Sequence, residues 1–261
     1  MKCMVCAHGD EDEFELIPYV KTLNVGIELQ SYGLKGVLSE QKWNETLQQH
    51  LKFKDRWRGR IAVHGPFLGI KYDYQDHILK EAVKMRLNRT YEVVRQIKPD
   101  TLVLHTGFSD EVEKFHLQNL WLQETMEFWQ KEIEKYAALN VTVVLENIIE
   151  SDPSYMKILV DNVNHPNLKL CFDIGHAHVW SHWSPSEWIE FLGNRIFHIH
   201  LHDNAGEQDN HLPVGKGSID FENFFNTVRK HIPDVTISLE VDSDKETVIE
   251  NLNYIIERYI I

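Results

Sequence analysis

Short runs of apolar and β-branched residues recur along the whole chain, separated by segments rich in Glu, Lys, Leu and Gln. Eight such runs occur, at residues 2–8, 24–32, 60–67, 100–108, 141–148, 168–177, 196–204 and 235–242. Their nearly continuous apolar character indicates strands that are buried on both faces, as in a parallel sheet. Residues 74–97 and 111–139 predict long helices, and Asp152-Pro153 and Ser184-Pro185 predict helix starts with a proline just inside an N-cap residue.

This regular alternation of strand and helix predicts the fold. Eight alternations, with no linker, repeat or low-complexity tract between them, predict an α/β fold: a single (β/α)8 TIM barrel over residues 1–261. A doubly wound open sheet is the structural alternative, but it usually has fewer strands and a glycine-rich first turn, which this sequence lacks. In a barrel enzyme, we expect the chemistry at the C-terminal ends of the strands.

Composition and charge narrow the class of protein. The 261 residues are 43% hydrophobic and 26% charged, as is typical of a globular protein with a sizeable core. A formal net charge of −13 argues against a general nucleic-acid or membrane-surface binder. The apolar residues at the N-terminus are too few for a signal-peptide core, and no stretch is long enough to span a membrane. We therefore expect a cytoplasmic protein.

The three cysteines fit a reducing compartment without a disulfide framework. Cys3 and Cys6 lie three residues apart, so on a strand their side chains point to opposite faces and cannot share a metal ion. We expect all three cysteines to be small core residues.

Histidines and carboxylates stand at the C-terminal ends of six predicted strands: His64, His105, Glu146, Asp173 with His176, the stretch HIHLHDN at 198–204, and Glu240. The two-residue period of a strand turns Val144 and Glu146 toward the barrel axis, and likewise His198, His200 and His202. Although one such histidine is usually a hydrogen-bonded core residue, several carboxylates at one rim repel each other unless protons or cations neutralise them. Together with imidazoles, they predict a divalent metal site, most naturally for Zn²⁺ or Mn²⁺.

Seven motifs carry a family resemblance: HGPF, HTGF, LEN, FDIGHAH, HLHDN, DNHLPVGKG and LEV, in this order between about residues 60 and 242. They resemble those of the xylose isomerase-like TIM-barrel superfamily, which contains sugar isomerases and epimerases as well as endonuclease IV (AP endonuclease family 2). In endonuclease IV, nine residues hold three zinc ions. The resemblance implies one ion at His64 and His105, with Glu146 bridging to a second ion at Asp173, His200 and Glu240, and a third ion at His176, Asp209 and His211.

Residues around this set are candidates for contact with a substrate. We take as candidates His202, Tyr72, Trp180 and Lys216. Glu28 faces inward on the second strand, where it either contacts substrate or pairs with a cation inside the barrel. Gly215 and Gly217 allow close approach of the backbone before the next helix. The GKGS segment is not a P-loop, because the upstream glycine is missing.

Two chemistries are compatible with this set of residues. The resemblance implies that a sugar or sugar-phosphate isomerase or epimerase uses Glu146, Asp173, His200 and Glu240, with the two glutamates moving protons. It implies that a phosphodiesterase uses all nine ligands. With neutral histidines, four carboxylates and three divalent ions give the site a net charge of roughly +2, which suits a phosphate anion. Four carboxylates with a single divalent ion give a net charge of roughly −2. The residues thus favour hydrolysis of a small phosphoester or phosphodiester by metal-bound hydroxide, with the isomerase or epimerase as the alternative.

DNA is not favoured as the substrate. A DNA endonuclease needs cationic side chains along the rim to neutralise phosphates. The loops after the second and third strands offer only Lys35 and Lys71, and Lys71 lies beside the acidic Asp73 and Asp76.

Overall fold

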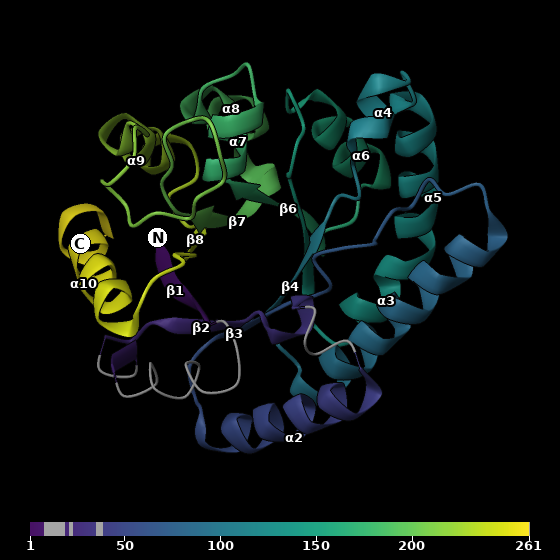
Figure 1. The fold of residues 1–261 in the computed structure, drawn as a ribbon, viewed down its shortest axis with the longest axis horizontal. Helices are drawn as coiled ribbons and strands as arrows, with labels where there is room; N and C mark the ends of the chain where they lie inside the picture. Colours follow the sequence, from purple (N-terminus) through teal and green to yellow (C-terminus); the bar gives the residue numbers. More distant parts are fainter. Residues whose placement is uncertain (8–18, 21–22, 35–38, 261) are drawn as a thin grey trace.

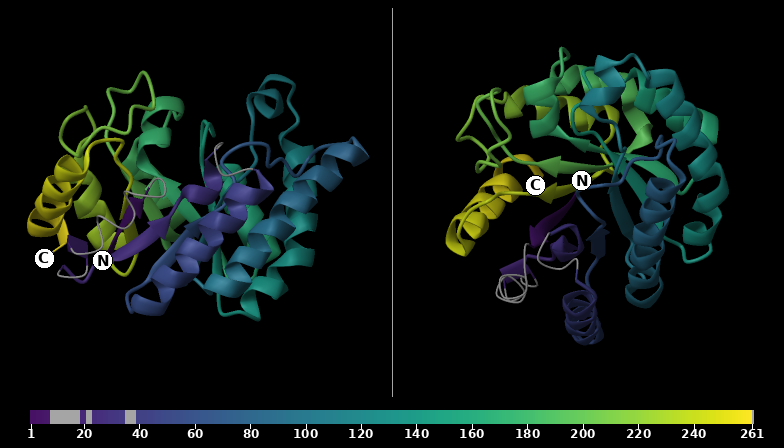
Figure 2. Two further views of the ribbon diagram at one scale, coloured as in Figure 1. Left: turned by 60° about the horizontal axis from the view of Figure 1, so that its bottom comes forward. Right: turned by 45° about the vertical axis from the view of Figure 1, so that its right-hand side comes forward.

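Eight parallel strands close into one barrel in the computed structural model, which describes residues 1–7, 19–20, 23–34 and 39–260 (Figures 1 and 2). Each strand pairs with its neighbours in chain order, and the last pairs with the first. This confirms the predicted (β/α)8 TIM barrel. The strands are β1 (Lys2–Ala7), β2 (Gly26–Leu29), β3 (Ile61–His64), β4 (Thr101–His105), β5 (Thr142–Glu146), β6 (Leu168–Asp173), β7 (Ile196–Leu201) and β8 (Thr236–Leu239).

Side-chain alternation along the strands separates two buried layers. Outward residues such as Val143 and Leu145 pack into the large core between barrel and helices. Inward residues Val103, Val144 and Cys171 form a small cluster inside the barrel. Along β3 to β7 the inward series continues to the C-terminal end, where histidines and carboxylates replace apolar side chains.

Helices surround the barrel on its outer side (Figures 1 and 2). The α-helices are α2 (Glu40–Arg56), α3 (His77–Ile97), α4 (Asp110–Lys114), α5 (Gln118–Ala137), α6 (Ser154–Val163), α7 (Ile174–Trp180), α8 (Pro185–Leu192), α9 (Phe221–His231) and α10 (Lys245–Ile255). Shorter turns are η1 (Ser31–Gly33), η3 (Gly193–Arg195) and the π-helical η4 (Ile256–Ile260). Ser184 begins α8 with a capping box and Pro185 in the first turn, as predicted.

The segment 111–139 was expected to form one helix, but the structure divides it into α4 and α5. His116 between them has a φ of 56°, a left-handed conformation that ends an α-helix. The Leu117 N–H donates to the Val112 carbonyl over 2.8 Å, and this bond satisfies a carbonyl that the broken helix leaves open. The expected helix start at Asp152-Pro153 lies one residue later, because α6 begins at Ser154.

The cysteines behave as expected, since Cys3, Cys6 and Cys171 are all buried as free thiols. In the part of the chain that the structure describes, no helix combines the length and apolar character needed to cross a membrane.

Candidate functional site

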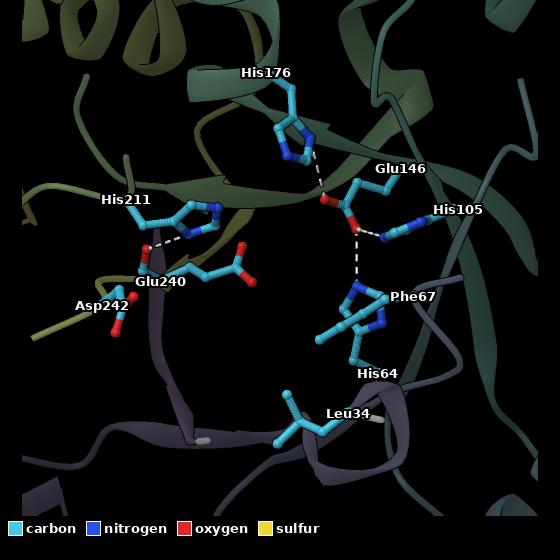
Figure 3. A pocket seen from close by; sticks show the side chains of 9 residues that line it. All are labelled: Leu34, His64, Phe67, His105, Glu146, His176, His211, Glu240 and Asp242. Carbon is cyan, nitrogen blue, oxygen red and sulfur yellow. Dashed lines mark hydrogen bonds and ion pairs between the residues drawn. The ribbon is translucent and has the colours of Figure 1, made fainter. Parts of the chain in front are cut away.

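A cavity of about 480 Å³ opens at the C-terminal rim of the barrel (Figure 3). Imidazoles and carboxylates from different strands and loops meet there, and two apolar side chains, Leu34 and Phe67, form part of its wall. The other lining residues are His64, His105, Glu146, His176, His211, Glu240 and Asp242. Sequence reasoning missed Leu34, Phe67 and Asp242, because they lie beyond the strand ends, where no periodicity predicts direction.

At the bottom of the cavity, one imidazole nitrogen faces three carboxylates. His200 Nδ1 lies 3.0 Å from Glu240 Oε2, 3.2 Å from Glu146 Oε1 and 3.8 Å from Asp173 Oδ2. Ligand atoms of these four residues lie within 4.8 Å of one another. Among the described residues, neither His200 Nδ1 nor Glu240 Oε2 has a well-aligned hydrogen-bond partner. Buried polar atoms without partners are costly, so this group requires a cation or a proton at its centre.

Glu28 sets the orientation of this imidazole from below. Its Oε1 accepts a hydrogen bond from His200 Nε2 over 2.9 Å, and its Oε2 accepts one from His198 Nε2 over 2.9 Å. All three side chains are fully buried. In the neutral imidazole Nε2 carries the proton, so the Nδ1 lone pair of His200 then points to the three carboxylates. Of the two roles considered for Glu28, the structure supports pairing with cationic or donor groups inside the barrel.

The electrostatics of this group demand positive charge. Burial alone would raise the pKa of Glu28, but His200 and His198 hold it well below its ordinary value. Burial alone would lower the pKa of His200, yet Cys171 and the surrounding carboxylates, Glu240 foremost, raise it well above that of a free imidazole. Without a cation, the site therefore favours a proton on His200.

A second group lies beside the first and shares Glu146 with it. His64 Nε2 lies 2.9 Å from Glu146 Oε2, and His105 Nε2 lies 3.7 Å from the same oxygen. His64 Nδ1 donates to the Gly65 carbonyl over 3.0 Å, and this bond directs Nε2 toward Glu146. Burial lowers the pKa of His105 to about 4, so its imidazole is neutral at pH 7.

A third group forms where the loop after β7 folds back over the rim. His176 Nε2 and His211 Nε2 lie 3.2 Å and 3.0 Å from Asp209 Oδ2. Their Nδ1 atoms donate to the carbonyls of Asn147 and Glu240 over 2.8 Å and 3.1 Å. The structure thus places all nine sequence-predicted ligands at one rim, in three adjoining groups.

None of the four residues expected to contact substrate is among the described residues that line the cavity. His202 is fully buried behind His211 and does not line the cavity. Tyr72 is buried against Phe128 and Trp129 in the outer core, because its ring lies on the helix side of the barrel. Lys216 lines a separate surface groove. Trp180 lies beside the site, 38% exposed, with its ring 5.5 Å from that of His176.

Other polar residues support the rim, and sequence reasoning did not find them. Asp203 accepts hydrogen bonds from the N–H groups of Gly215 and Gly217 over 3.0 Å and 2.7 Å. A Cβ at Gly217 would lie 2.2 Å from the Asn204 carbonyl oxygen, which confirms the close approach expected there. The expectation was wrong for Gly215, where a Cβ would meet nothing within 4 Å and the glycine instead allows a φ of 89°. Gln30 donates from Nε2 to Glu240 Oε1 over 2.5 Å. The only sequence signal for these contacts was polarity directly after a strand.

Lys71, one of the two lysines considered for neutralising phosphates, is not among the described residues that line the cavity. Lys71 forms an ion pair with Glu111 over 3.1 Å, and Lys35 lies outside the described residues. Among the described residues that line the cavity, there is no lysine or arginine.

Fold and site together define a (β/α)8 barrel with clustered imidazoles and carboxylates at its C-terminal rim. The sequence profile of the xylose isomerase-like TIM barrel matches residues 28–258, and the chain belongs to this family. An uncharacterized protein of Methanocaldococcus jannaschii is 25% identical over 207 residues, which cover 76% of this chain and 70% of that protein.

Two solved structures share the fold over nearly the whole chain. A D-tagatose 3-epimerase-like protein has a TM-score of 0.81 and 22% identity, covering 100% of this chain and 97% of that one. A Thermus thermophilus protein soaked with ZnCl2 has a TM-score of 0.76 and 23% identity, covering 97% of both chains.

Proposed function

We propose that this protein is a metal-dependent isomerase or epimerase of a sugar or sugar phosphate. The observation that carries the proposal is the placement of Glu146 and Glu240. Their carboxylates lie on two sides of His200, with ligand atoms within 4.8 Å of one another, and both line the cavity (Figure 3). The whole-chain likeness to a D-tagatose 3-epimerase-like protein supports the same class of substrate.

The donor set fits a divalent metal ion. Glu146, Asp173, His200 and Glu240 combine one imidazole with three carboxylates, a composition that suits Zn²⁺ or Mn²⁺. The unpartnered His200 Nδ1 and Glu240 Oε2 are the atoms that such an ion would satisfy. When bound, the ion polarises the carbonyl and hydroxyl oxygens of a sugar. The ZnCl2-soaked relative of the same fold is consistent with this assignment.

Proton transfer is the task of the two glutamates. Isomerisation or epimerisation needs one group to remove a proton beside a carbonyl and a group to return it. Burial would raise the pKa of both carboxyls, but His200 holds each well below its ordinary value, so both are ionised. The Gln30 amide and the His64 imidazole fix one oxygen of Glu240 and one of Glu146. The second oxygen of each faces His200.

The walls of the cavity suit a small polyhydroxylated substrate. Leu34 and Phe67 exclude water from one side, while Asp242 offers an acceptor for hydroxyl groups at the opposite side (Figure 3). The described lining residues contain no fixed cation, which favours a neutral sugar over a phosphodiester.

Phosphoester hydrolysis is the second candidate, and one observation favours it. A centre with one ion needs only the ligands of the central group, and His176, Asp209 and His211 provide further ligands beside it. By its ligand set, the sequence favoured phosphoester hydrolysis. The lack of lysine and arginine among the described residues that line the cavity, together with the whole-chain likeness to an epimerase-like protein, favours the sugar reaction.

Solvent exchange distinguishes the two functions. We expect the protein, loaded with Mn²⁺ or Zn²⁺ in D2O, to place deuterium on the carbon beside the carbonyl of at least one ketose, aldose or phosphorylated derivative. NMR measures the exchange, and a parallel series of phosphodiesters measures hydrolysis. Phosphodiester cleavage without any exchange on sugars would reject the isomerase proposal.

Substitution of Glu28 tests the orientation of His200. Glu28→Gln replaces an acceptor-only carboxylate by an amide that can donate, so the proton of His200 can move to the nitrogen that faces the carboxylates. We expect metal affinity to fall about 10–100-fold, as for loss of other partners behind a ligand. Competition with a chromophoric chelator measures the affinity. Glu92→Gln, an exposed change on α3, is the control and should leave it unchanged.

A further inference from the structure

We propose that His202 closes the group of His176, Asp209 and His211 into a four-ligand metal site that fastens the loop between β7 and α9 to the barrel rim. Sequence reasoning gave this group three ligands, and it considered His202 only as a substrate contact. The site is separate from the central group of Glu146, Asp173, His200 and Glu240, and it is compatible with either chemistry there.

The distances in this group lie near those of a tetrahedral site. Two ligand atoms that each lie about 2.0–2.1 Å from a zinc ion are about 3.3–3.4 Å apart in tetrahedral geometry. Asp209 Oδ2 lies 3.0 Å from His211 Nε2 and 3.2 Å from His176 Nε2, and Asp209 Oδ1 lies 3.8 Å from His202 Nε2. All four ligand atoms lie within 4.8 Å of one another. Small side-chain shifts therefore suffice to bind an ion.

The protonation of the imidazoles leaves room for a cation. His176 and His211 each donate Nδ1–H to a backbone carbonyl, so in the neutral imidazole of each residue the Nε2 lone pair faces the Asp209 carboxylate. A lone pair and a carboxylate oxygen do not attract each other without a proton or a metal ion between them. Asp209 Oδ1, moreover, is buried without a hydrogen-bond partner among the described residues.

His202 is built into this group rather than left at the surface. Its ring is fully buried and stacks on that of His211, with centroids 3.9 Å apart and an interplanar angle of 4°. Gly175 makes space for it, since a Cβ there would lie 1.9 Å from His202 Cε1. Three protein ligands leave a position open for water or substrate, whereas four close the coordination sphere. A fourth ligand, His202, thus points to a structural ion.

The ion would hold the tip of a loop whose base is already held. Asp203 binds the N–H groups of Gly215 and Gly217 at the base, and Asp209 and His211 lie between these points. His211 has a φ of 45°, a left-handed conformation that is uncommon for a histidine and strains the backbone. A bond from its side chain to a metal would offset this strain. The loop passes above the rim beside α7, which carries His176 (Figure 1).

His202 also has a second candidate role, as a hydrogen-bond donor to Asp173 in the central group. Its Nε2 also lies 3.1 Å and 3.2 Å from the two oxygens of Asp173, in the central group. If His202 only donates to Asp173, its removal should weaken the central ion and leave the loop group intact.

Metal titration of the full-length chain tests the site. We expect His202→Ala to weaken one class of Zn²⁺ site by about 100-fold or more, beyond the usual effect of losing a partner behind a ligand. Asp209→Asn should do the same, and its 23% exposed side chain makes misfolding a smaller concern. Co²⁺ in the wild type should show the strong visible absorption of a four-coordinate ion, and both variants should lose it. Limited proteolysis should then cut within residues 205–212 faster than in the wild type.

His178→Ala is the matched control. His178 also lies on α7 and contacts the same loop through Ser218 Oγ at 2.9 Å, but it is outside the ligand group. This variant should keep every Zn²⁺ equivalent. In a Glu146→Gln background, His202→Ala should remove one further equivalent if the two sites are separate. An unchanged Zn²⁺ affinity and Co²⁺ spectrum in His202→Ala would reject His202 as a ligand, even if Asp209→Asn loses the ion. Loss in His202→Ala of only the ion that Glu146→Gln removes would also reject the proposal. Neither result would affect the solvent-exchange test of the sugar reaction.

Discussion

Glu240→Gln and Glu146→Gln are each expected to reduce turnover at least about a hundredfold, the scale of a missing acid–base group. Each change removes a charge from the group around His200 Nδ1, which lies 3.0 Å from Glu240 and 3.2 Å from Glu146. An amide can neither accept a proton from a sugar carbon nor bind a divalent ion as strongly as a carboxylate. Steady-state rates at saturating metal, together with the metal content of each variant, measure the effect.

Asp242→Asn is the matched control for this pair. Asp242 lines the same cavity but belongs to none of the ligand groups found among the described residues. Its substitution should change substrate affinity by about 1 kcal/mol, the scale of one hydrogen bond, and leave turnover nearly intact. Near-normal turnover of either glutamate variant would show that the central group is not the active site.

Removal of metal ions is expected to lower thermal stability strongly. Without cations, the buried carboxylates of the central group repel one another and are satisfied only if histidines take up protons. An ion present at about 1,000 times its dissociation constant stabilises the folded state by about 4 kcal/mol. For a chain of this size, that corresponds to about 8–16 °C in Tm. Calorimetry of the chelator-treated protein, before and after addition of Zn²⁺ or Mn²⁺, measures the shift.

The central-site variants show where this stabilisation arises. Glu146→Gln should show a smaller rise in Tm on metal addition, because it lacks a ligand that two of the groups share. Addition of Mg²⁺, which binds imidazole poorly, should raise the Tm less than Zn²⁺ does. A metal-free protein as stable as the metal-loaded one would contradict the assignment of these residues as ligands.

Local sequence patterns were enough to predict the barrel and the rim that carries the site. Strand identity follows from local apolar patterns, and the direction of each side chain follows from the two-residue period of a strand. Because parallel barrel strands end at one face, the sequence alone assigns the strand-end residues His64, His105, Glu146, Asp173 and Glu240 to one rim. The motif resemblance added Asp209 and His211, which no periodicity would place there.

The pairing of individual atoms in the site could not be predicted from these patterns, because it depends on contacts between distant strands. Glu28 and His200 are separated by 172 residues, and their contact determines which imidazole nitrogen points to the carboxylates. Tyr72 and His202 looked similar as candidate contacts, yet one packs in the outer core and the other behind His211. The break at His116 likewise depends on how Val112 and Leu117 bond across it. Local patterns predict the face on which a side chain lies, but its partner and its protonation depend on residues that only the closed barrel brings within about 3 Å.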